Sequence, residues 1–352
     1  MTHPLHHYNY VLPSENIRKE PITPRDHSRL FVYDTTTDTV TFDYFYNLSH
    51  YLPSPSLMVI NNTGVIPARV IFRKDTGGKV EGLVLMNEGV ASDGTIPVIV
   101  NGRIFPGRRL SLSPHHWFTI VRQDEQRFYL KSEFDGALLP EILGRYGVTP
   151  TPKYLGTQTL SENDLRVRYQ TIFAKEKRSV AAPTASLHFT NEVFTTLDEK
   201  GVRRTEITLD VGLGTFAEVR ENQVKEKRLH SEKFSISSEA HKDIQEAKKE
   251  KCPVVAVGTT VTRTLEFNAD RLLHESSQEI IGETDLFIVP PFEFKIVDHL
   301  LTNFHVPQSS LMALVDAFLA HKKAKKNILD LYDIAKQEGF MFYSFGDSML
   351  IL

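Results

Sequence analysis

Residues 253–266, with the sequence PVVAVGTTVTRTLE, are the segment with the clearest potential to bind a ligand. An apolar run leads into Gly258, Thr259 and Thr260, and a helical pattern follows. Backbone N–H groups at the start of a helix lack intrahelical acceptors, so with the helix dipole they can hold an anion or a ribose. Alternatively, Thr259 or Thr260 simply caps the helix. The residues alone leave both interpretations open.

A second glycine-spaced turn, DVGLGTF at residues 210–216, follows a strand-like segment. It lacks the third glycine and the following helix of a dinucleotide-binding fingerprint. Its glycines either let the backbone approach a ligand closely or form a bulge. Taken alone, this turn does not identify a site.

Three histidines lie in or beside predicted turns, where functional groups concentrate: His188 in PTASLHF, His230 in LHSE and His305 in TNFHVP. A histidine can exchange protons near neutral pH, but each could instead make structural hydrogen bonds. The sequence has no HExxH motif and no closely spaced His/Asp cluster, so we predict no metal site. It also lacks a GxSxG elbow and a P-loop.

The charge pattern bears on the kind of partner. The net charge of −3 argues against a wholly basic nucleic-acid protein, but it allows a local basic patch. Basic stretches occur at residues 225–228, 248–251 and 321–326. They are either solvated faces or, if they converge on one side, a surface that grips an RNA backbone.

The single cysteine, Cys252, excludes an internal disulfide and a cysteine-rich metal site. The apolar VVAV that follows it indicates a packed thiol rather than a nucleophile. The N-terminus shows no secretory signal, and no stretch approaches the about 18 apolar residues of a membrane helix. We therefore expect a soluble cytoplasmic protein.

The elements that must position these residues fall into two groups. Short strands are predicted at residues 30–33, 39–42 and 57–60, and the last ends at the turn-forming Asn61-Asn62-Thr63-Gly64. Six further strand-like runs follow with turns between them and no intervening helix. These runs are residues 68–74, 79–86, 95–100, 108–113, 117–122 and 127–134. Such spacing indicates a small antiparallel barrel or sandwich inserted into a larger domain.

After a proline-rich hinge at residues 148–152, strands and helices alternate, as in an α/β domain. The predicted helices are residues 163–174, 191–200, 240–251 and 308–320, and the predicted strands are 203–212, 253–258 and 286–291. The predicted fold is therefore an α/β main domain carrying an inserted small antiparallel β-barrel domain. We expect residues 1–66 and 148–352 to form the main domain and residues 67–147 the barrel.

Several motifs occur in a fixed order along almost the whole chain, from about Tyr10 to the C-terminus. They are YVLPSENI, PRDHSRL, NNTGVIPARV, APTASLHFT, DVGLGTF, LHSE, VGTTVTRTLE, TDLFIVPPFEFKIVDHLLTNFHVPQSSLMALVDAF and YSFGDSMLIL. Together they resemble the S-adenosylmethionine:tRNA ribosyltransferase-isomerase family of the queuosine pathway. The resemblance implies the same architecture, an α/β domain with an inserted barrel.

The resemblance also implies a reaction with S-adenosylmethionine as cosubstrate and tRNA as partner. The ribosyl moiety moves onto 7-aminomethyl-7-deazaguanine in the tRNA anticodon loop and rearranges to the epoxycyclopentanediol of epoxyqueuosine, releasing adenine and methionine. The sulfonium acidifies the 5′ carbon, so a base must remove a proton there. The departing adenine needs a proton donor, and the attacking amine must be neutral. No metal is required.

Residues of this sequence that match the family's motifs are the candidate site. Candidates for proton transfer are His188, His230 and His305, with Glu232 as orienter or base. The candidate cosubstrate-binding residues are Gly212, Gly214, Thr215, Phe216, Gly258, Thr259, Thr260, Arg263 and Asn303. Other close matches are Thr184, Phe189, Ser231, Lys295, Asp298, Thr302 and Phe304.

Some positions depart from the family pattern. Where the family usually has N-D-T-R, this chain has Asn61-Asn62-Thr63-Gly64. Asp210 replaces a usual histidine, Ser186 a usual glycine and Gln308 a usual lysine. Losing an arginine and a lysine removes two contacts to phosphate or carboxylate groups. An aspartate cannot replace His⁺ as a proton donor unless its pKa is strongly raised.

These departures leave two alternatives beside the transferase-isomerase: a divergent paralogue acting on another acceptor, and an inactive binder of RNA or S-adenosylmethionine. An active enzyme should gather His188, Glu232, His305 and the Gly258 turn around one pocket. An inactive binder could have that pocket filled by side chains such as Leu213. A monomer is favoured, although no pattern in the sequence fixes the oligomeric state.

Overall fold

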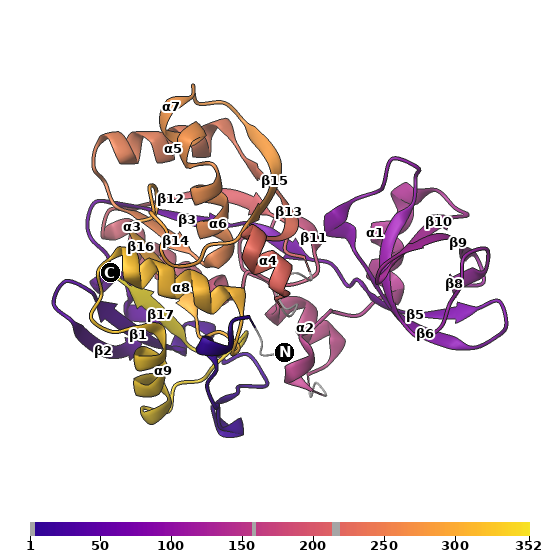
Figure 1. Cartoon of the computed structure of the whole chain (residues 1–352), viewed down its shortest axis with the longest axis horizontal. Coiled ribbons are helices and arrows are strands. Elements are labelled where there is room, and N and C mark those ends of the chain that lie inside the picture. The colour runs from indigo at the N-terminus through magenta and orange to yellow at the C-terminus, as the bar shows by residue number, and fades with distance from the viewer. Residues whose placement is uncertain (1–3, 157–159, 213–218) are drawn as a thin grey trace.

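The computed structural model describes residues 4–156, 160–212 and 219–352. The apolar segments that flank the predicted barrel come together in one mixed sheet, and the barrel lies to one side of it (Figure 1). The order in this nine-stranded sheet is β15-β13-β12-β3-β14-β16-β17-β1-β2. The bounds are β1 Arg29–Asp34, β2 Thr39–Tyr44, β3 Ser56–Asn61, β12 Val202–Leu209, β13 Arg228–Ile236, β14 Val254–Val257, β15 Ile280–Leu286, β16 His299–Asn303 and β17 Ser348–Ile351.

The four central strands, β12, β3, β14 and β16, run parallel to one another. In β14 every residue is buried, with Val254 and Ala256 in one core cluster and Val255 and Val257 in another. A parallel strand covered on both faces is uniformly apolar rather than alternating. The apolar run predicted as a buried strand at residues 253–258 is thus confirmed. Because these strands are parallel, their carboxyl ends meet at one edge of the sheet.

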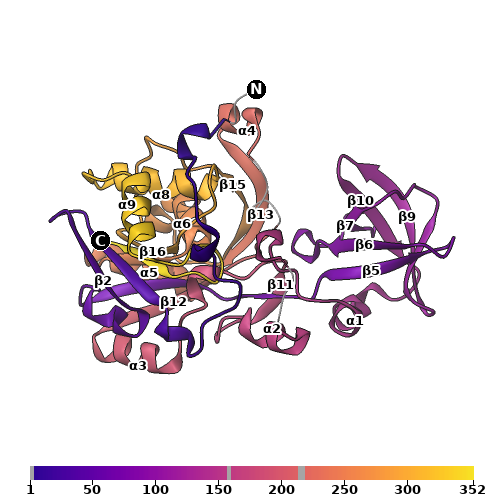
Figure 2. The same cartoon turned by 90° about the horizontal axis from the view of Figure 1, so that it is seen from below.

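Helices cover both faces of the sheet. In Figure 2, α6, α8 and α9 lie on one side and α3 on the other. The core clusters agree, because α5, α6, α8 and α9 pack into one cluster and α3 into the other. The bounds are α2 Glu162–Arg168, α3 Asn191–Glu199, α4 Glu221–Glu226, α5 Ser238–Lys249, α6 Thr259–Phe267, α7 Ala269–His274, α8 Ser310–His321 and α9 Ile328–Gln337.

All six predicted runs between residues 68 and 134 form strands, and they close into an antiparallel barrel of order β10-β7-β6-β5-β8-β9 (Figure 2). The bounds are β5 Arg69–Lys74, β6 Lys79–Val84, β7 Ile96–Asn101, β8 Arg109–Ser113, β9 His116–Asp124 and β10 Arg127–Ser132. The barrel has its own core, to which helix α1 (Leu139–Tyr146) contributes Leu139 and Leu143. The predicted fold class is confirmed, although α1 was not predicted.

We propose that residues 67–147 form the inserted domain. The two chain segments that join it to the sheet pair with each other, since Arg69 and Val148 exchange backbone hydrogen bonds of 3.2 and 2.8 Å. At Gly147 a Cβ atom would lie 1.8 Å from the carbonyl oxygen of Pro67, so only glycine fits this approach. The paired segments support a boundary at this point.

Two predicted elements differ from the structure. The helix predicted over residues 163–174 ends with α2 at Arg168. Shortly afterwards, the Gln170 side chain bonds both the N–H and the carbonyl of Val65, and this tertiary contact replaces a further helical turn. The strand predicted over residues 286–291 was wrong, since β15 ends at Leu286. The prolines at residues 290 and 291 lack the N–H that a sheet ladder needs.

Smaller predicted features can also be placed. The Cys252 thiol is buried in the main core, as expected. The chain after β3 forms β4 (Thr63–Val65), which pairs in parallel with β11 (Glu176–Ser179) in a separate two-stranded sheet. In the described part of the chain, no helix is long and apolar enough to span a bilayer.

Candidate active site

The candidate motifs follow the carboxyl ends of the four parallel central strands. Asn61 ends β3, Asp210 follows β12, Gly258 follows β14 and Asn303 ends β16. Ligands of open α/β sheets bind in the crevice outside these ends. Motifs spread over some 240 positions of the chain are therefore collected at one edge by the topology alone.

Gly258 forms the turn between β14 and α6. Its φ of +92° and ψ of 156° lie in a region that only glycine adopts readily. Its N–H donates to the Leu301 carbonyl at 2.7 Å, which ties the turn to β16. No side chain caps α6, so neither Thr259 nor Thr260 plays that role. The amides of the first turn of α6 have no intrahelical acceptor and remain suited to an anion or a hydroxyl-bearing ligand.

The neighbouring segment after β16 presents Asn303 and His305. The side-chain Oδ1 of Asn303 accepts a 2.8 Å hydrogen bond from Thr184 Oγ1, whereas its Nδ2 is buried without a hydrogen-bond partner. A buried amide N–H without a hydrogen-bond partner costs free energy. A ligand acceptor beside Asn303 would remove that cost.

His305 is buried and structurally constrained. Its Nε2 lies 3.0 Å from Thr302 Oγ1, and its backbone N–H donates to the Tyr332 hydroxyl at 2.7 Å. Its carbonyl accepts from the Tyr10 hydroxyl at 2.5 Å. Burial disfavours the imidazolium form and lowers the pKa of His305 to about 3. The ring is therefore neutral at physiological pH.

One cavity is lined by both the Gly258 turn and the segment after β16. Its lining also includes residues from the segments before α3 and after α9, and its enclosed volume is about 60 Å³. Small-molecule pockets usually enclose about 300 Å³ or more, so a nucleoside-sized ligand would also occupy its open mouth. The lining residues are Tyr154, Ala182, Pro183, Thr184, Ala185, Val211, Gly258, Thr259, Thr260, Thr302, Asn303, Phe304, His305, Val306, Leu311, Tyr343 and Ser344.

Glu232 and Arg263 form a buried ion pair beside this cavity. Arg263 Nη1 lies 2.5 Å from Glu232 Oε2, and their side chains are 6% and 2% exposed. Glu232 Oε1 accepts a 3.0 Å hydrogen bond from the N–H of Gly212, which directly follows the lining residue Val211. Arg263 lies one turn after Thr259 on α6, and its Nη2 is buried without a partner. The pair thus supports the wall of the cavity without lining it.

His230 was predicted in or beside a turn, and it lies near the start of β13, two residues before Glu232. It is half-buried and does not line the cavity. Burial is the main factor that lowers the pKa of His230, with smaller effects from Arg127 and Arg220. Burial therefore favours the uncharged ring in both His230 and His305.

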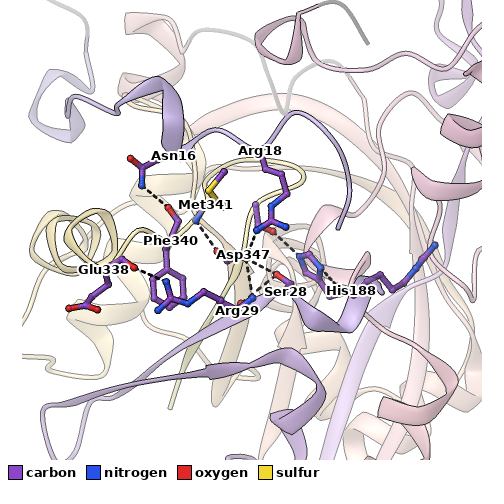
Figure 3. Close-up of polar contacts among 11 residues, drawn as sticks. Asn16, Arg18, Ser28, Arg29, His188, Glu338, Phe340, Met341 and Asp347 are labelled. Carbon is purple, nitrogen blue, oxygen red and sulfur yellow. Dashed lines mark hydrogen bonds and ion pairs between the residues drawn. The ribbon is translucent and has the colours of Figure 1, made fainter. Parts of the chain in front are cut away.

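His188 lies on a different cavity. Its Nδ1 is 3.0 Å from the Arg25 carbonyl and its Nε2 is 2.9 Å from the Gly346 carbonyl (Figure 3). Burial lowers the pKa of His188, although both contacts and Asp347 oppose that shift. The expected gathering of His188, Glu232, His305 and Gly258 around one pocket is therefore met only by His305 and Gly258.

Of the glycine-spaced turn, Gly212 is described and bonds Glu232 through its N–H. Space there is tight, since a Cβ on Gly212 would lie 2.8 Å from Asn87 Nδ2. Three predicted cosubstrate-binding residues lie outside the described residues, as does Leu213, the side chain considered for filling the pocket. The three are Gly214, Thr215 and Phe216.

Two of the altered motif positions serve the structure around β3. The Asn62 amide donates to Glu206 Oε2 at 3.0 Å and accepts from Thr208 Oγ1 at 2.7 Å. Gly64 is a buried residue of β4, in register with Lys177. Neither Asn62 nor Gly64 lines the cavity.

The other three altered positions are closer to the cavity. Buried Asp210 accepts a 3.3 Å hydrogen bond from Thr63 Oγ1. Ser186 is fully buried, and its Oγ has no hydrogen-bond partner. Gln308 has a φ of +56°, and its N–H donates to the Tyr8 carbonyl at 3.1 Å. None of the three lines the cavity directly.

Among the described residues, no three His, Cys, Asp or Glu side chains come together in a group that could hold a metal ion. The side chains that sequence reasoning missed are Tyr154 and Tyr343, which line the cavity beside Ser344. Tyr343 and Ser344 stand in the tail motif YSFGD, whose residues give no indication in the sequence that they line a cavity. Tyr154 carries no motif, and only the folded chain brings its hydroxyl to Ser344.

The fold and the cavity define a class, an α/β protein with a ligand crevice at the carboxyl ends of its parallel strands and a barrel beside it. The model of the queuosine biosynthesis protein family matches residues 5–351, and the chain belongs to this family of enzymes.

Individual relatives agree over their whole length. An S-adenosylmethionine:tRNA ribosyltransferase-isomerase from Carboxydothermus hydrogenoformans is 42% identical over 346 residues, with 98% of each chain covered. The protein of the same name from Aquifex aeolicus is 41% identical over 346 residues, again with 98% of each covered. The crystal structure of an S-adenosylmethionine tRNA ribosyltransferase from Thermotoga maritima has a TM-score of 0.55 and 32% identity, covering 98% of this chain and 99% of that one.

Proposed function

We propose that this enzyme transfers the ribosyl moiety of S-adenosylmethionine to 7-aminomethyl-7-deazaguanine in tRNA. The product is epoxyqueuosine, and adenine and methionine are released. The observation that carries the proposal is the cavity in which the uncapped start of α6 faces the buried Asn303 and His305. It lies at the carboxyl ends of parallel strands, in a chain matched from end to end by relatives of that name.

We assign the binding of S-adenosylmethionine to this cavity. The amides at Thr259 and Thr260 suit a ribose hydroxyl or the carboxylate of the methionyl part. The unpaired Nδ2 of Asn303 suits a hydroxyl or ring-nitrogen acceptor. Gly212, Gly214, Thr215, Phe216 and Arg263 remain proposed binding residues, and Arg263 is supported by its place one helical turn after Thr259.

Among the four candidates for proton transfer, His305 is favoured because it lines the cavity. Its neutral ring can accept a proton, and the lowered pKa makes the ring a weak base for the 5′ carbon but, once protonated, a strong donor to the departing adenine. Glu232, beside the cavity, is proposed to orient the Gly212 turn or to act as base. His230 and His188 remain less direct candidates, because neither lines this cavity. Proton transfer and amine attack together require no metal.

The acceptor is proposed to be the anticodon loop of a tRNA, whose exposed base can be drawn out of its stack into a pocket. We propose that the protein acts as a monomer in the cytoplasm, where tRNA is modified. The altered positions Asn62, Gly64, Ser186, Asp210 and Gln308 all lie off the cavity lining, which supports the parent activity rather than an inactive binder.

The test is a transfer assay with S-adenosylmethionine labelled in its ribosyl group and tRNA bearing 7-aminomethyl-7-deazaguanine. We expect label in the tRNA and one adenine released per label incorporated. The same tRNA with guanine at that position is the matched control and should take up no label. Absence of label, with an active relative positive on the same tRNA, would rule the proposed function out.

A further inference from the structure

A second cavity shares an apolar cluster with the candidate active site. It encloses about 290 Å³ and is lined by eight residues, among them Arg25, Arg168 and His188. Its wall contains Leu187 and Phe345, which belong to the same small apolar cluster as Ala182 of the first cavity. Phe345 also directly follows Ser344 of the first cavity. The same apolar cluster therefore contributes to the walls of both cavities.

The two arginines of this cavity lack a counter-charge. In the part of the chain that the structure describes, neither Arg25 nor Arg168 lies within ion-pair distance of a carboxylate. Burial lowers the pKa of Arg25, and repulsion from Arg168 adds to the effect. Two like charges held together without a carboxylate repel each other and destabilise the fold.

Neutral acceptors hold both guanidinium groups in place. Arg25 Nη1 donates to the Gln170 carbonyl at 3.0 Å. Arg168 Nη2 donates to the Thr23 hydroxyl at 2.6 Å and to the Pro21 carbonyl. Each guanidinium has five N–H donors, so several on each remain for a ligand. Both arginines line the cavity, and among the described side chains neither contributes a buried nitrogen that lacks a partner.

The buried carboxylate of Asp347, which acts electrostatically on His188, is already satisfied. Asp347 accepts hydrogen bonds from Ser28 Oγ at 3.0 Å, Arg29 N at 3.0 Å and Met341 N at 2.8 Å, and it pairs with Arg18 at 3.4 Å (Figure 3). This network also reaches His188, which contacts the Gly346 carbonyl on one side and the Arg25 carbonyl on the other. His188 thereby holds the Arg25 carbonyl, and Asp347 is not among the residues that line the cavity.

Paired, planar guanidinium groups recognise phosphate oxygens through several charge-assisted hydrogen bonds. An enclosed volume near 290 Å³ accommodates a phosphate with its adjoining sugar. We propose that this cavity binds one backbone phosphate of the tRNA, close to the nucleotide that reacts in the neighbouring cavity. The proposal rests on the proposed function for its source of phosphate. Arg25 and Arg168 are its ligands, and His188 is a positioning residue.

The first test compares Arg25→Gln and Arg168→Gln with wild type in tRNA binding at several salt concentrations. Loss of one phosphate contact should weaken binding about tenfold and lower the slope of log Kd against log salt by about one. Arg25→Lys should recover part of the affinity but not the bidentate geometry. The matched control is Arg271→Gln, which removes a partly exposed arginine of α7 whose carboxylate partner among the described residues is Glu275. It should bind as wild type does.

A second arm leaves the protein unchanged, because loss of Arg168 bonds to Thr23 could affect folding. Single methylphosphonate linkages, which lack the phosphate charge, are placed along the anticodon loop of the tRNA. One position should weaken wild-type binding and cause no further loss in Arg25→Gln. If every position has additive effects in both proteins, or the folded variants bind tRNA like wild type, the proposal is wrong.

Two measurements distinguish this phosphate site from the proposed function and from a site for free inorganic phosphate. In the transfer assay the variants should raise KM for tRNA and leave kcat and the Kd for S-adenosylmethionine unchanged. If wild type transfers no ribosyl group but shows the arginine-dependent tRNA binding, the proposed function fails and the phosphate site stands. If inorganic phosphate alone raises the Tm of wild type but not of Arg25→Gln, while tRNA affinities are equal, the tRNA assignment is overturned.

Discussion

At the scale of single residues, the candidate site combines satisfied and unsatisfied polar groups. Asn303 Nδ2 and Arg263 Nη2 are both buried without partners. Buried polar groups in native proteins are nearly always hydrogen-bonded, so each exception calls for an explanation. A ligand at the start of α6 would explain Asn303, which lines the cavity. Arg263 is compensated in charge by Glu232 and needs no ligand for that purpose.

The Glu232–Arg263 pair should be strongly coupled in stability. Glu232→Gln leaves a buried arginine without its counter-charge and should cost about 3–5 kcal/mol of unfolding free energy. In the double variant Glu232→Gln, Arg263→Met the charge is gone as well, so part of that loss should return. Urea denaturation of the single and double variants measures the coupling. A double variant with the summed loss of its single variants would contradict a direct pair.

At the scale of elements, the sheet topology brings the candidate motifs together, which no single motif indicated. The motifs around Asn61, Asp210, Gly258 and Asn303 are far apart in sequence, and four parallel strands place them along one edge. The strands themselves were predictable. Buried parallel strands are continuous apolar runs, and in barrel strands apolar and polar residues alternate between one turn and the next. The ends of elements were less predictable, because tertiary contacts such as that of Gln170 with Val65 decide them.

The same reasoning explains which site residues the sequence supplied. Gly258, Thr259 and Thr260 were predictable from a strand, a glycine and a helix start in succession. Tyr154 was not predictable, because its contact with Ser344 joins two residues that are 190 positions apart in the sequence. His188 was chosen for its residue type, and its position on the second cavity follows only from the packing of Leu187 and Phe345.

The turn before α6 gives an element-scale prediction. Gly258→Ala forces a Cβ into a backbone conformation that costs on the order of 1–3 kcal/mol. It should also turn the first amides of α6 and weaken S-adenosylmethionine binding by about tenfold or more. Calorimetric titration measures that affinity. The matched control is Gly339→Ala, at a glycine of φ +70° with open space around it, which should keep full affinity. Equal affinities in both variants would contradict the assignment.

At the scale of the whole molecule, two charge features stand out. The arginines of the second cavity carry charge that no described carboxylate balances, while several histidines are buried in neutral form. Burial lowers the pKa of His305 to about 3 and that of His299 to about 4. Burial also raises the pKa of Glu266, and this acts in the opposite direction at low pH.

The histidines predict acid sensitivity. Between pH about 6.5 and about 4 the unfolded chain binds protons at His299 and His305 that the native state does not, so stability falls as pH falls. Each contributes roughly 1.4 kcal/mol per pH unit in that window. Above pH about 6.5 their contribution is constant. Glu266, protonated more readily when folded, offsets part of the loss near its own pKa.

Urea denaturation at successive pH values tests this dependence. His299→Gln removes one of the two groups without touching the candidate active site, since His299 lies at the opposite end of β16 from Asn303. Its slope of unfolding free energy against pH should be lower by roughly 1.4 kcal/mol per unit. A slope equal to that of wild type would show that His299 is not held neutral by the fold.

The central claim is that S-adenosylmethionine binds at the start of α6, and amide hydrogen exchange with and without this cosubstrate tests it most directly. The amides of Thr259, Thr260 and Val261 lack intrahelical acceptors and should exchange more slowly once ligand is bound. The predicted result is protection at these three amides, which lie next to the segment around Asn303. Saturating binding with unchanged exchange at these amides and protection elsewhere would contradict the account.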